Sequence, residues 1–121
     1  MRDDRRRLLD ILDAIDCIER YVRKGRGEFD QDELIRVWIV HHLQVIGEAA
    51  RGTSRTLRTG HPEVPWPDVI ALRNLLVHEY FGIDAQQVWD SATIDVPPLR
   101  HQIELTLREL EAEAGGDSTA E

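Results

Sequence analysis

The sequence has few of the features that mark secreted, membrane-bound or disulfide-stabilised proteins. Its 121 residues include one cysteine, Cys17, which cannot form a disulfide within the chain. No apolar run approaches the ~20 residues that span a bilayer. The charged N-terminus MRDDRRRLLD is not followed by an apolar signal segment. We therefore expect one cytoplasmic domain with no membrane partner.

The chain also lacks an excess of basic residues. It has 15 Lys and Arg against 23 Asp and Glu, which gives a net charge of -8 at pH 7. This charge argues against a protein that coats nucleic acid through bulk electrostatics, and we expect no DNA partner. One stretch, RGTSRTLRTGH at 51–61, has no acid. Its arginines, Arg51, Arg55 and Arg58, either attract phosphate or simply keep a surface loop soluble.

No segment alternates between apolar and polar residues as a strand does, and no glycine-rich phosphate loop is present. Apolar residues recur instead at steps of three and four, as in Leu8, Leu12 and Ile15, which is typical of amphipathic helices. The predicted long helices run from Leu8 to Val22, from Asp30 or Asp32 to Gly52, from Pro67 to Gly82, and from Asp95 or Pro97 onward, with one short helix over AQQVWDSA. We predict an all-α bundle of four long helices plus one short helix over residues 1–110. Residues 111–121 are predicted to form a disordered acidic tail.

The stretch RNLLVHEY at 73–80 places a cation, an amide, an imidazole and a phenol on one predicted helix. Asn74 and His78 are four residues apart and share a face, and Arg73 is long enough to reach them. A base and a fixed cation suffice for metal-free cleavage of RNA. His78 would take the proton of the ribose 2′-hydroxyl, and Arg73 would neutralise charge on the phosphate.

A purely structural role for the same residues is the more frequent outcome of such spacing. Arg73 would then pair with an acid, His78 would be stabilised at a helix C-terminus, and Tyr80 would pack with its hydroxyl in water. A metal site is disfavoured because His41 and His42 point about 100° apart on a helix, and no Glu-x-x-His pair is present. We expect no metal and no other cofactor.

A family resemblance shifts the balance towards chemistry. RNLLVHEY has the R-x-x-x-x-H-x-Y pattern of the HepT-like toxins of the HEPN superfamily, and HHLQVIGEAA, Trp66–Pro67, FGID, VWD and DVPPLRHQI surround it at similar spacing. The similarity covers roughly residues 5–108. It implies a HEPN-type helical bundle that acts as a homodimer with a composite cleft. Arg73 and His78 match the catalytic pair of a metal-independent endoribonuclease toxin, and Asn74 matches its supporting polar position.

The resemblance also implies partners. In this family a nucleotidyltransferase antitoxin of the MntA type transfers AMP onto the tyrosine of the motif, here Tyr80, and the homodimer can belong to a larger hetero-complex. RNA is the implied substrate, and Arg51, Arg55 and Arg58 become candidates for guiding it. Glu48, in IGEAA, either orients Arg73 or His78 or forms a buried structural ion pair. The alternative function is a non-catalytic helical adaptor or RNA-binding partner of a nucleotidyltransferase.

Overall fold

The computed structural model describes residues 2–78 and 85–120, and every regular element in these two ranges is helical. The elements are α1 (Arg2–Val22), α2 (Arg26–Gln31), α3 (Glu33–Arg51), α4 (Arg55–Gly60), α5 (Trp66–His78), α6 (Ala85–Asp90), the π-helical turn η1 (Ser91–Asp95) and α7 (Val96–Ala120). The all-α class and the four long helices are confirmed. The prediction of one short helix was too low, since α2 and α4 are also present. None of these helices is both long enough and apolar enough to cross a bilayer.

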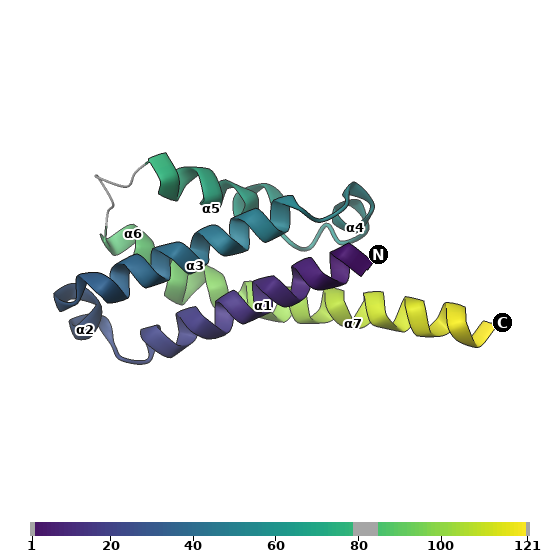
Figure 1. Cartoon of the computed structure of the whole chain (residues 1–121), viewed down its shortest axis with the longest axis horizontal. Helices are drawn as coiled ribbons and strands as arrows, with labels where there is room; N and C mark the ends of the chain where they lie inside the picture. Colours follow the sequence, from purple (N-terminus) through teal and green to yellow (C-terminus); the bar gives the residue numbers. More distant parts are fainter. Residues whose placement is uncertain (1, 79–84, 121) are drawn as a thin grey trace.

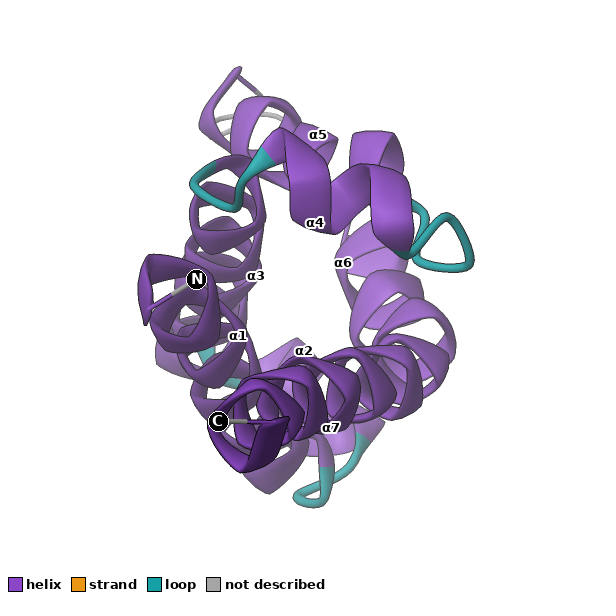
Figure 2. Ribbon diagram, turned by 90° about the vertical axis from the view of Figure 1, so that its right-hand side faces the viewer, coloured by secondary structure: helices purple, strands orange, loops and turns teal. Residues whose placement is uncertain are grey.

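Helix α3 is central to the bundle. It packs between α1 and α5, while α1 also packs against α7 (Figure 1). The view along the helices in Figure 2 shows α4 on one side of this arrangement and α7 on the opposite side. The core is aliphatic, and its fully buried side chains on the long helices include Leu8, Ile11, Ile15, Ile18, Ile39, Leu43, Ile46 and Ile103. Burial of such side chains contributes about 1.5–3 kcal/mol each and is the main force that holds the bundle together.

The helix ends follow from capping residues. Asp32 accepts a hydrogen bond from the Leu34 amide (2.9 Å) at the start of α3, and Gly52 follows its last residue, as the sequence predicts. Ser54 accepts a hydrogen bond from the Leu57 amide (3.1 Å) and starts α4 inside the stretch 51–61. The sequence analysis assigned no helix to this stretch because its single buried apolar residue, Leu57, provides no periodicity.

Helix α7 is tied to α1 by ion pairs. Arg100 donates to Glu19 (2.7 Å from Nε) and also pairs with Asp16. The hydrogen bond with Asp16 raises the pKa of Arg100, partial burial opposes this shift, and Glu19 adds to it. These contacts join segments that are more than 80 residues apart in the chain.

The C-terminal segment differs from the sequence prediction. Residues 111–120 are helical in the structure, not disordered, and the end of α7 projects beyond the other helices (Figure 1). Adding residues to an existing helix avoids the cost of nucleation, and the Glu and Ala residues of 111–114 are good helix formers. An ion pair between Arg5 and Glu111 (3.1 Å) holds the start of this extension against α1.

Candidate functional site

The candidate site is built on the crossing of α3 and α5. A Cβ atom added at Gly47 of α3 would lie 2.6 Å from the backbone nitrogen of Arg73 and 3.0 Å from its Cβ. Real Cβ atoms do not approach a backbone atom so closely, so only glycine allows this contact. The two helices therefore touch through their backbones at the first residue of the motif.

This crossing brings Glu48 to Arg73. An oxygen of the Glu48 carboxylate, Oε2, contacts Nε of Arg73, while Oε1 lies 3.7 Å from Nη1 of Arg51. The Arg73 and Glu48 side chains are 40% and 51% exposed. The pair therefore lies at the surface, and it is not the buried ion pair that the sequence left open.

The geometry of this pair leaves Arg73 able to bind an anion. Glu48 occupies the Nε position, and within the described part of the chain Arg73 has no other polar contact. A guanidinium has five N–H donors, so its Nη1 and Nη2 edge can still form a fork with two phosphate oxygens. Glu48 fixes the side chain without consuming its capacity for phosphate.

The other motif residues are described only in part. Asn74 and His78 lie on α5, and their helical backbone positions, four residues apart, place them on one face. Their side chains lie outside what the structure describes. Tyr80 falls in residues 79–84, which are also outside the described residues.

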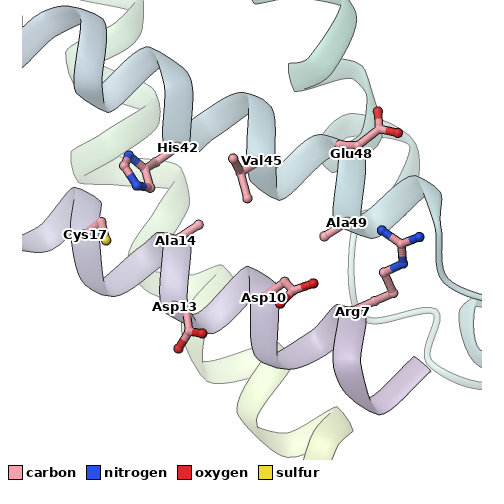
Figure 3. Close-up of a pocket in the computed structure, with 9 residues that line it drawn as sticks. All are labelled: Arg7, Asp10, Asp13, Ala14, Cys17, His42, Val45, Glu48 and Ala49. Atoms are coloured by element: carbon pink, nitrogen blue, oxygen red, sulfur yellow. The ribbon is translucent and has the colours of Figure 1, made fainter. Parts of the chain in front are cut away.

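A groove of about 340 Å³ lies beside the site, between α1 and α3. Figure 3 shows Arg7 and Glu48 towards one end of this groove and Cys17 and His42 towards the other. The polar side chains that line it include three carboxylates, those of Asp10, Asp13 and Glu48. His42 is buried, with Nδ1 2.8 Å from the carbonyl oxygen of Trp38. The groove is therefore unfavourable for a phosphate along most of its length.

The three arginines of the stretch 51–61 have different environments. Arg51 and Arg55 are exposed, and Arg55 has no partner among the described residues. Arg58 is half-buried, and its Nη1 donates to the carbonyl oxygen and to Oγ1 (3.1 Å) of Thr53. Arg58 therefore holds the turn between α3 and α4, which the sequence spacing could not show.

Arg7, which lies close to the end of α3, was not among the predicted site residues. A Cβ atom at Gly52 would be 2.7 Å from Cζ and from Nε of the Arg7 guanidinium. The available signal was the glycine, which the sequence analysis used only as a helix end. A glycine also permits close approach of another side chain to the backbone.

Comparisons with known proteins agree on one family. The family model described as Ribonuclease HepT-like matches residues 11–106. The chain is 38% identical over 105 residues to "Putative RNase MJ1380" of Methanocaldococcus jannaschii, covering 86% of this chain and 96% of that protein. It is 34% identical over 98 residues to "Probable ribonuclease HepT" of Thermococcus cleftensis, covering 80% of this chain and 89% of that protein. No solved structure gives a significant match.

Proposed function

Because this chain belongs to the HepT-like ribonuclease family, we propose that it is a metal-independent endoribonuclease toxin whose chemistry rests on Arg73 and His78. The observation that carries the proposal is Arg73 itself. It is fixed at the Gly47 crossing, is paired through Nε to Glu48, and has no other polar contact among the described residues.

The proposed reaction is an internal transfer at phosphorus. Neutral His78 takes the proton of a ribose 2′-hydroxyl, and the resulting oxyanion attacks the adjacent phosphorus. The bond from phosphorus to the 5′-oxygen breaks, this oxygen leaves as a 5′-hydroxyl by taking a proton from water, and His78 returns its proton to water. The other product is a 2′,3′-cyclic phosphate. Arg73 stabilises the negative charge that builds on the phosphate oxygens, and Asn74 is the supporting polar residue.

We assign Glu48 the role of a positioning residue. Changing Glu48→Ala should lower the kcat for RNA cleavage roughly 10-fold with a smaller change in KM, because Arg73 loses its fixed orientation before substrate binds. Glu48→Gln keeps a side-chain oxygen that can accept from Nε, so it should recover part of the loss. Cleavage of a fluorescent RNA measures both constants. Glu113→Gln, which removes an exposed acid on α7, is the matched control. Equal losses from Glu113→Gln and Glu48→Gln would contradict the assignment.

The proposed silencing mechanism uses Tyr80. A nucleotidyltransferase antitoxin of the MntA type would use the Tyr80 hydroxyl to attack the α-phosphorus of ATP, forming an AMP ester and releasing pyrophosphate. The added phosphate would carry negative charge and acceptor oxygens onto a residue of the same motif as Arg73. It would therefore compete with RNA for the free edge of that guanidinium.

This mechanism predicts a mass change that depends on one tyrosine. The chain has two tyrosines, Tyr21 and Tyr80, so Tyr21→Phe is the matched control for Tyr80→Phe. Intact mass after incubation with ATP, Mg²⁺ and the nucleotidyltransferase should rise by AMP units for wild type and Tyr21→Phe, with loss of RNA cleavage. Tyr80→Phe should keep its mass. Loss of cleavage without a mass change would indicate silencing by complex formation, and no cleavage by the untreated wild type would favour the adaptor.

We also propose that the active form is a homodimer, which can join a larger complex with the antitoxin. The support is an uncovered apolar stripe on α3 that leads towards Glu48. Leu34 is 77% exposed, and Val37 and Trp38 are each 44% exposed. Large apolar side chains grouped on one face favour contact with another protein surface. Sedimentation of the purified chain distinguishes the dimer from the monomer.

A further inference from the structure

One end of the bundle joins the beginning of α1, the end of α3 and the beginning of α4 (Figure 1). Asp4 is buried there, and its two carboxylate oxygens accept hydrogen bonds from the Ser54 amide (2.8 Å) and the Ser54 hydroxyl (2.6 Å). Arg7 lies one turn further along α1, against Gly52. Residues from three helices are therefore held close together at this end.

Three exposed arginines gather at this end. Arg7 lies with its guanidinium against the backbone of Gly52, because that residue has no side chain. Arg51 is the last residue of α3, and Arg55 is the first residue of α4. Within the described ranges, neither Arg7 nor Arg55 has a carboxylate partner. All three arginines are exposed residues.

The acids near these arginines do not neutralise them. The Asp4 carboxylate is buried and accepts two hydrogen bonds from Ser54. Glu48 contacts Arg73 directly and lies 3.7 Å from Arg51, so its single charge is shared. Some other arginines are paired with acids, as Arg26 is with Asp30 at 2.8 Å. Two of the three arginines beside the candidate site, Arg7 and Arg55, thus have no carboxylate partner in the part of the chain that the structure describes.

We propose that Arg7, Arg51 and Arg55 bind phosphates of the RNA strand on one side of the cleaved bond; the inference rests on the proposed ribonuclease function. Glu48 lies between Arg73 and Arg51, so the cations continue from the reacting phosphate towards the end of α3. Beyond Arg7, which lines one end of it, the groove between α1 and α3 offers no rival path, because Asp10 and Asp13 line it and would repel the strand. Arg58 is not part of this surface, since it is held by Thr53.

The salt dependence of RNA binding tests this assignment. All variants are made in a His78→Ala background, so that the fluorescent single-stranded RNA is bound without being cut. Neutralising one phosphate contributes about 0.7 to the slope of log affinity against log salt for single strands. Arg7→Glu and Arg55→Glu should each reduce that slope by about this amount, and the dissociation constant in 0.1 M salt should rise about five-fold or more.

Arg23→Glu is the matched control because it makes the same charge change on an exposed residue beyond the opposite end of α1. It should leave the slope unchanged. Arg55→Glu guards against a folding artefact, since an acid in the first turn of α4 is favourable for the helix and the residue has no partner to lose. Circular dichroism verifies that each variant remains helical.

The possible outcomes distinguish a failure of the assigned RNA-binding surface from a failure of the proposed ribonuclease function. Lower slopes for Arg7→Glu and Arg55→Glu, with Arg23→Glu unchanged, support the assigned surface. If all three variants weaken RNA binding equally, or if none of them weakens it, the assigned surface is wrong. The proposed function still stands in that case, provided that the wild type cleaves RNA. If the wild type neither binds nor cleaves RNA, the proposed function fails and the inference fails with it.

Discussion

Replacing Arg73 or His78 by alanine should reduce RNA cleavage to the background rate. A positioned general base typically contributes about 10²–10⁴-fold, so His78→Ala should lose that factor. Arg73→Ala removes the charge that stabilises the phosphate and should cost about 10²–10³-fold. The double variant should cleave RNA only slightly more slowly than the less active of the two single variants, because residues that act as a unit show strongly non-additive effects.

Initial rates of RNA cleavage by the purified proteins, and growth of cells that produce each variant without the antitoxin, measure this prediction. Arg20→Ala removes an exposed arginine of α1 and should retain full activity. Each variant must also show the wild-type thermal unfolding temperature. If folded Arg73→Ala and His78→Ala proteins inhibited growth as strongly as the wild type, these residues would not be catalytic.

The substitution Gly47→Ala should weaken both the fold and the activity. Alanine is favoured over glycine inside a helix by about 1 kcal/mol. Overpacking costs about 1–3 kcal/mol, and the upper end applies because the neighbour at 2.6 Å is the backbone of Arg73, which cannot rotate away. We expect a net loss of about 2 kcal/mol in the free energy of unfolding, and a fall of about 8 °C in Tm.

The activity of Gly47→Ala should fall further than its stability explains. The added methyl group pushes α5 away from α3, and a displacement of about 1 Å at a catalytic group can cost about 10²-fold in rate. Assays at a temperature where the variant is fully folded separate the two effects. Gly27→Ala is the control, because a Cβ at Gly27 in α2 would have no atom within 4 Å. A Gly47→Ala protein with unchanged Tm and activity would show that the helices do not need this close crossing.

Much of the fold followed from the sequence because the helices carry regular apolar patterns. Leu8, Ile15 and Ile18 repeat at helical spacing, and all three are fully buried. The cap at Asp32 and the end of α3 at Gly52 could also be predicted from the sequence. Helix α4 could not, because its six residues bury one apolar side chain and its start depends on Asp4, which is 50 residues away. A local pattern cannot show a cap that a distant residue supports.

The residues of the site could be predicted from the motif, but their contacts with the rest of the chain could not. The order of residues in RNLLVHEY identified Arg73 as a candidate, but could not show which of the chain's acids would meet it. That partner is set by Gly47, whose missing side chain lets α5 approach α3 and places Glu48 beside the guanidinium. Arg7 and Arg58 show the same limit, since tertiary contacts with Gly52 and Thr53 give them opposite environments.

The packing of α5 has a consequence for local stability. Helix α1 is held between α3 and α7, whereas α5 packs principally on α3. An element with one main interface can detach at a lower free energy than the whole bundle needs to unfold. The segment that carries the motif therefore depends on one main interface, that with α3. Activity can be lost by partial opening of α5 in a molecule whose other long helices remain folded.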